Sequence, residues 1–168
     1  MSTPLKRVVD DLLEASGMAA ELLDDADAAY VRAGVDRVLS SLKARRAWEN
    51  HIGLVLTHRQ ILDITEWSKQ ALSQAVHAGR VLRLHAEDGT VGYWSAGLTE
   101  TSPHRPLPGL EETLTAWASA TVDPWTVASW FSTEQPELDD RTPRKALVEG
   151  DIDAVVMLAR QAAARLAA

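Results

Sequence analysis

The stretch from Thr57 to Trp94, THRQILDITEWSKQALSQAVHAGRVLRLHAEDGTVGYW, decides the predicted fold of this 168-residue chain. Thr57 and Gln60 have the spacing of a capping box, which marks the start of a short apolar helix. A tight connection at residues 65–67 leads to a second helix, predicted over residues 68–78. Gly79 can end that helix in a left-handed conformation.

A β-hairpin is predicted directly after the second helix. The segments VLRL (81–84) and VGYW (91–94) flank Asp88-Gly89, a pair of residues typical of tight hairpin turns. Arg83 alternates with its leucine neighbours, so we expect its side chain to face solvent. Two helices at a turn followed by a hairpin are the outline of a winged helix-turn-helix. We therefore predict a mostly α fold with a small β-hairpin wing, joined to a helical C-terminal domain.

The second helix has two different faces. Its apolar side carries Ala71, Leu72, Ala75 and Val76, while the opposite side has amide, hydroxyl and imidazole groups and no carboxylate. Gln can bind the edge of adenine through two hydrogen bonds and Ser can contact several bases, so this face suits a DNA major groove. The alternative is an ordinary solvated helix face. The residues predicted to read bases are Ser68, Lys69, Gln70, Ser73, Gln74 and His77.

The charge distribution supports the same segment. The chain has a net charge of −7, yet residues 43–85 carry 7 basic and 3 acidic side chains. The cations predicted to contact DNA phosphates or to lie on the wing are Arg59, Arg80 and Arg83, because they lie inside the predicted module. Arg45-Arg46 is more simply the charged end of a helix. A basic segment of this length can also arise by chance.

Composition narrows the class of protein. The chain has no cysteine, which excludes disulfides and Cys-ligated zinc. It also lacks a stretch of 18 apolar residues, a Gly-rich phosphate loop and any recognisable nucleophile motif. We therefore expect a soluble cytoplasmic protein that is not an enzyme, with no metal, no cofactor and no membrane partner, and that joins the nucleoid when bound to DNA.

Four regions are predicted along the chain. Residues 1–48 form helices, residues 49–99 the winged module, residues 100–110 a Pro-rich linker, and residues 111–168 a helical domain. The first region should contain helices from about Thr3 to Ser16, Met18 to Leu23 and Ala26 to Trp48. The last of these has an apolar stripe of Val31, Val35, Val38, Leu39 and Leu42. This stripe either packs within the chain or pairs with a second copy, since DNA-binding modules are often homodimers.

The C-terminal helices show clear start and stop signals. Helices are predicted over 110–117, after Asp123-Pro124, after Thr142-Pro143 up to Gly150, and after Asp151. The run from Val122 to Ala163 resembles the toxin-binding domain of antitoxins of the Xre/MbcA/ParS type. The positions that carry the resemblance are Trp130, Pro136, Leu138, Thr142, Pro143, Leu147, Gly150, Val155 and Val156, of which Trp130, Pro136, Thr142, Pro143 and Gly150 are the main markers of the fold.

The resemblance implies a function. Antitoxins of this type join a DNA-binding domain to the helical domain, dimerise, repress their own operon and block a toxin whose RES domain degrades NAD. We accordingly expect a transcriptional regulator that binds double-stranded DNA and a partner protein. Three alternatives stay open: an orphan regulator without a toxin, a protein-interaction adaptor that binds no DNA, and a DNA binder with little sequence preference.

Overall fold

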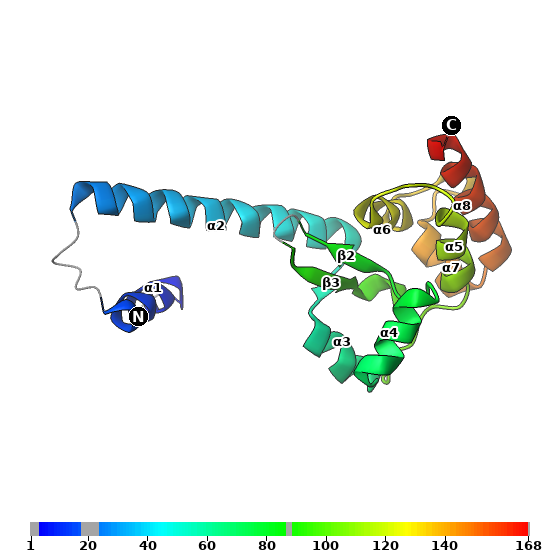
Figure 1. The fold of residues 1–168 in the computed structure, drawn as a ribbon. Coiled ribbons are helices and arrows are strands. Elements are labelled where there is room, and N and C mark those ends of the chain that lie inside the picture. Colours follow the sequence, from blue (N-terminus) through cyan, green and yellow to red (C-terminus); the bar gives the residue numbers. More distant parts are fainter. Residues whose placement is uncertain (1–3, 18–23, 87–88, 168) are drawn as a thin grey trace. The chain divides into compact units, whose positions relative to one another are not determined.

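The computed structural model describes residues 4–17, 24–86 and 89–167. The chain divides into two compact units, residues 1–46 and residues 47–168, and the boundary falls within the long helix α2 (Asp25–Ile52). The predicted mostly helical fold with a small antiparallel sheet is confirmed (Figure 1). Among the described residues, no helix has both the length and the apolar character needed to cross a membrane.

The first unit consists of α1 (Pro4–Ser16) and most of α2. The start of α2 is capped reciprocally, since Asp24 Oδ1 accepts from the Asp27 N–H at 2.8 Å and Asp27 Oδ2 accepts from the Asp24 N–H at 3.2 Å. The helix predicted from Met18 to Leu23 lies outside the described residues. The predicted helix over 26–48 is confirmed but continues to Ile52, which is buried, and ends before Gly53, with φ 89°.

The second unit is built on a three-stranded antiparallel sheet with the order β1-β3-β2. β2 (Arg83–His85) and β3 (Val91–Trp94) form the predicted hairpin, in which His85 pairs with Val91. Asp88 of the predicted Asp88-Gly89 turn lies outside the described residues. β1 (Val55–Leu56) adds a third strand that the sequence did not predict. Two residues are too few to show the alternation that identifies a strand.

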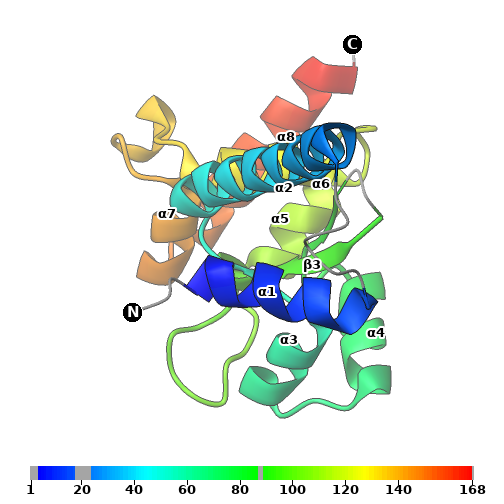
Figure 2. The same ribbon diagram turned by 90° about the vertical axis from the view of Figure 1, so that its left-hand side faces the viewer.

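Helices α3 (His58–Thr65) and α4 (Lys69–His77) lie next to each other against one face of this sheet (Figures 1 and 2). The predicted capping box of Thr57 and Gln60 is present, and the turn between the helices passes through Glu66, which has φ 57°. A buried cluster holds the two helices to the sheet. It consists of Ile61, Leu72, Ala75, Val81, Tyr93 and Leu98, with Trp67 partly buried beside it.

The Pro-rich segment 100–110, predicted as a linker, is fastened to the module. The His104 N–H donates to the Ile64 carbonyl at 3.0 Å, and Arg105 Nη1 donates to the Thr65 carbonyl at 2.7 Å. Leu107 is buried as well. These contacts fix the segment along the end of α3.

Four helices follow this segment: α5 (Leu110–Trp117), α6 (Pro124–Ser132), α7 (Pro143–Glu149) and α8 (Ile152–Ala167). Short 3-10 turns lie at Ser95–Gly97 and Pro136–Leu138. The predicted start signals at Asp123 and Thr142 are confirmed, because Asp123 accepts from the Trp125 N–H and Thr142 accepts from the Lys145 N–H. The predicted stop at Gly150 is confirmed by its φ of 93°.

The second face of the sheet packs against these C-terminal helices. Leu84 of β2 and Trp94 of β3 belong to the same buried cluster as residues of α5 to α8. Ring contacts extend from Trp94 to Phe131 (5.0 Å between centroids), from Phe131 to Trp130 (5.1 Å) and from Trp130 to Trp117 (5.3 Å). Residues 47–168 therefore form one compact unit with a buried cluster on each face of the sheet.

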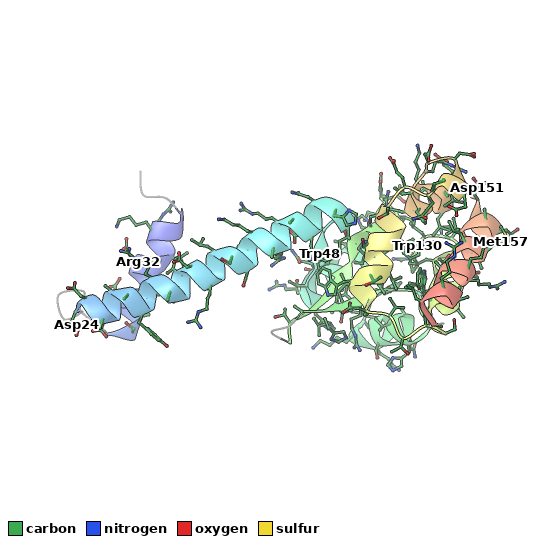
Figure 3. All side chains as sticks on the ribbon, turned by 90° about the horizontal axis from the view of Figure 1, so that it is seen from above. Asp24, Arg32, Trp48, Trp130, Asp151 and Met157 are labelled. Carbon is green, nitrogen blue, oxygen red and sulfur yellow. The ribbon has the colours of Figure 1, made fainter. Side chains whose placement is uncertain are left out.

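Trp48 lies near the end of α2 (Figure 3). Its ring lies 5.3 Å from that of Trp125, and His51 is hydrogen-bonded to Ser129 Oγ at 2.8 Å. Trp125 Nε1 in turn donates to the His85 carbonyl at 2.8 Å. The beginning of α6 is thus attached both to α2 and to the hairpin.

Candidate nucleic-acid interface

Helix α4 is held by local signals at both ends. Ser68 is its N-cap and accepts a hydrogen bond from the Ala71 N–H at 3.1 Å. At the other end Gly79 has φ 68°, the Gly79 N–H donates to the Val76 carbonyl and the Arg80 N–H donates to the Ala75 carbonyl. This pair of bonds is the Schellman motif, which needs a left-handed residue at the glycine position. The helix is therefore short and has a defined orientation.

The two predicted faces of α4 are confirmed. Leu72 and Ala75 are buried against α3 and the sheet, with Ala71 and Val76 partly buried beside them. The exposed residues are Lys69, Gln70, Ser73, Gln74 and His77. The outer surface of α4 thus consists of hydrogen-bonding groups and one cation.

A hollow of about 200 Å³ lies between this surface and the hairpin. It collects side chains from α3, α4, β2 and β3: His58, Lys69, Leu72, Ser73, Val76, His77, Arg83 and Tyr93. Two of its residues, Arg83 and Tyr93, are paired across the strands and so share one face of the sheet. Among the described residues that line the hollow there is no carboxylate, although the chain as a whole is acidic.

Specific hydrogen bonds organise the hollow. His58 Nδ1 lies 3.1 Å from Tyr93 Oη, with the two rings 6.0 Å apart, so this pair joins α3 to β3 beside the hollow. His77 Nδ1 lies 2.9 Å from the Ser73 carbonyl, one turn earlier on α4. As the carbonyl accepts, His77 Nδ1 is the donor in this contact, and Nε2 is the ring nitrogen left for a ligand.

The predicted site residues fall into two groups. Lys69, Ser73, His77 and Arg83 come together around the hollow, whereas Gln70 and Gln74 are exposed on α4 and do not line it. Ser68 serves as a helix cap.

Arg59 and Arg80 do not line the hollow, and each faces a carboxylate. Arg59 Nε lies 3.9 Å from Asp63, one turn along α3, and Arg80 Nε lies 4.0 Å from Glu111 on α5. Exposed pairs of this kind contribute little to stability, about 0 to 1 kcal/mol. Both arginines can therefore exchange their partners for phosphates at low cost.

Sequence reasoning missed His58 and Tyr93 as parts of this surface. A signal for Tyr93 was present in the segment VGYW. Side chains alternate along a strand, so Tyr93 must lie on the face opposite to that of Trp94. His58 carried no such signal, because its position beside β3 depends on how α3 packs.

The marker residues of the C-terminal domain build its turns and core. Pro136 starts a 3-10 turn, Thr142 caps α7, Pro143 is its first residue, and Gly150 ends it. Trp130 packs edge-on against Trp117 and Phe131. All five residues therefore act as scaffold.

Arg141 fastens the loop before α7. Its Nη1 lies 2.6 Å from both Glu149 Oε2 and Asp151 Oδ2. Its hydrogen bond to Glu149, and to a smaller extent that to Asp151, raises the pKa of Arg141 above its ordinary value, because both favour the charged guanidinium. Among the described residues no group of three His, Cys, Asp or Glu side chains is placed to hold a metal ion.

Comparison of the chain with protein-family models, with curated proteins and with solved structures gave no match.

Proposed function

We propose that residues 49–99 form a winged helix-turn-helix that binds double-stranded DNA, and that the protein is a transcriptional regulator of the cytoplasm and nucleoid. The observation that carries the proposal is the absence of a carboxylate from the exposed face of α4 and from the described residues that line the hollow beside it, in a chain of net charge −7. A solvated helix face usually mixes Glu with Lys. A face with only donors, acceptors and cations is suited to a polyanion.

The order of the elements supports this module. A helix end, a short strand, two helices at a turn and a two-stranded hairpin follow one another along the chain, and the three strands form one sheet. In modules of this kind the second helix of the pair enters the major groove and its exposed side chains reach base edges. Here that helix is α4. The hairpin β2–β3 then extends beside it as the wing.

Base reading is assigned to Gln70, Ser73 and Gln74. Their side chains are exposed, and amide and hydroxyl groups can satisfy the donor and acceptor pattern of base edges in the major groove. His77 Nε2 adds a further contact at the end of the helix. These contacts decide which sequence is bound.

Phosphate binding is assigned to Lys69 and Arg83, which line the hollow from α4 and from the wing. A phosphate oxygen entering the hollow meets cations from two elements and the hydrogen-bonded pair of His58 and Tyr93. Arg59 and Arg80 add contacts when DNA displaces their carboxylate partners. The phosphate contacts position the helix and carry no sequence information.

A selection experiment tests this assignment. Duplexes bound by the protein are selected from a random-sequence library, and the affinity of variants for the selected duplex is measured. Each of Gln70→Ala and Ser73→Ala should weaken binding by about 1 to 3 kcal/mol, as expected when one base is no longer read. Gln161→Ala is the matched control, because Gln161 is an exposed amide on α8. If both α4 variants bind with unchanged affinity, the assignment of base reading to α4 is wrong.

We also propose that the C-terminal helices bind a partner protein, as the antitoxin resemblance implies, with a RES-domain toxin as the first candidate. Val148 on α7 and Met157 on α8 are exposed apolar side chains at which this second role can be tested. Co-expression with a RES-domain protein encoded by a neighbouring gene should yield a complex that Val148→Asp and Met157→Asp weaken. The absence of such a gene would leave an orphan regulator.

The protein-interaction adaptor is the competing function. It predicts that random duplex is not bound even at low salt, where phosphate contacts are strongest. The DNA-binding proposal predicts measurable binding under those conditions and a steep loss of affinity as salt is added.

A further inference from the structure

The first part of α2 has no buried side chain. Residues 25–46 are all described, and each is exposed or only partly buried, while the one buried residue of the helix is Ile52, beyond this part. Val31, Val38 and Leu42 are 41%, 59% and 45% exposed. A helix in a globular protein draws most of its stability from packing an apolar face. The described residues do not bury this face.

The apolar residues follow a coiled-coil spacing. Val31, Val35, Val38 and Leu42 are separated by four, three and four residues, which is the alternation of a heptad seam. Ala28 extends the seam by three residues toward the N-terminus. A continuous narrow stripe of this kind fits one other helix lying along it.

The charges of the same segment are polarised. Residues 24–36 contain four aspartates and one arginine, Arg32, whereas residues 37–46 contain four basic residues and no acidic one. Two copies lying parallel would place like charges beside each other. Two copies lying antiparallel would place the acidic half of each beside the basic half of the other.

We propose that residues 25–46 of α2 pair with the same residues of a second copy in an antiparallel two-helix coiled coil. In this register Val35 faces the partner subunit's Val38, and Val31 faces the partner subunit's Leu42. Every contact occurs twice, because an interface of two identical surfaces is related by a twofold axis. This arrangement buries the apolar stripe and also places the acidic half of each helix beside the basic half of the other.

This dimer does not depend on the DNA-binding proposal. It is formed by the first unit alone and is measured without nucleic acid, so a failure of either proposal leaves the other untouched. Substitutions on the exposed face of α4 should leave the dimer unchanged.

Sedimentation equilibrium of the full chain tests the interface. The wild type should be a dimer, and Val38→Asp should raise the dissociation constant about 100-fold or more, because it removes an apolar contact and buries a carboxylate in each half of the seam. Tyr30→Asp is the matched control on the same helix. Tyr30 is 76% exposed and lies off the stripe, so this variant should dimerise like the wild type.

Two results would overturn the proposal. A monomeric wild type would mean that α1 or another occupant covers the stripe, and a Val38→Asp variant that dimerises as strongly as the wild type would place the interface elsewhere. Circular dichroism is the control for misfolding. The helical signal of residues 47–168 should remain in every variant.

Spin-label distances test the orientation. The chain has no cysteine, so single labels can be attached through Ala26→Cys and Ala33→Cys, two exposed positions on the same side of α2. At a rise of 1.5 Å per residue, the antiparallel register separates the two copies' labels along the helix axis by about 30 Å at residue 26 and about 10 Å at residue 33. A longer distance at residue 26 supports the antiparallel dimer. Equal distances at both positions would contradict it.

Discussion

Replacing Leu84 with alanine should destabilise the helix pair α3–α4 and the C-terminal helices together. Leu84 lies on β2 with no exposed surface and belongs to the cluster that joins the sheet to α5 to α8. Removing a buried leucine in this way costs about 2 to 5 kcal/mol, from reduced burial and from the cavity left behind. Leu54→Ala is the matched control, because Leu54 is 62% exposed and should change stability by less than about 0.5 kcal/mol.

Hydrogen exchange measures this effect in separate parts of the chain. In Leu84→Ala the protection of amides in α4 and in α8 should fall by the same factor, about 30-fold or more, since 1.4 kcal/mol corresponds to a factor of ten. Equal losses are expected because residues 47–168 form one compact unit in which the two buried clusters lie on opposite faces of the same sheet. Protection that changes in only one of the two helices would show two independently folding parts and refute unfolding as one unit.

Three further predictions concern local structure, each checked by urea unfolding. Gly109→Ala should cost more than about 1 kcal/mol, because Gly109 has φ 81° and an added Cβ would lie 2.6 Å from Ile152 Cγ2; full wild-type stability would mean that α5 and α8 do not approach as described. Glu66→Gly should raise stability by up to about 1 kcal/mol, because Glu66 has a left-handed φ of 57° at the end of α3, and a decrease would contradict this. Asp123→Ala should cost about 0.5 to 2 kcal/mol through removal of the cap to the Trp125 N–H, and no change would show that the cap contributes nothing.

Elements with local signals were predictable from the sequence. Thr57, Asp123 and Thr142 each place an acceptor where a helix begins, and Gly79 and Gly150 allow the left-handed residue where one ends. The alternation around Arg83 also predicted its exposure correctly. In each case the residues that determine the helix end or the exposed strand position lie within a few residues of it. Such features can therefore be predicted without knowledge of tertiary contacts.

Features that depend on tertiary contacts were not predictable. The sequence suggested a separate C-terminal domain beyond a linker, but Leu84 and Trp94 bury their side chains against that domain. Alternation shows that a strand has two faces and leaves open what covers each of them. The hollow was not predictable for the same reason, because His58 approaches Tyr93 only when α3 packs beside β3. The DNA-reading role of the α4 face remains a prediction.

The salt dependence of duplex binding tests the central claim, that α4 and the wing bind DNA. The variant with Lys69→Gln and Arg83→Gln should bind more weakly, and the slope of log affinity against log salt should become less steep by about 0.9 for each phosphate that is no longer neutralised. The variant with Arg160→Gln and Arg165→Gln loses the same charge from exposed positions on α8 and should keep the wild-type slope. Equal slopes for the wild type and both variants, or no binding of the wild type at low salt, would contradict the claim.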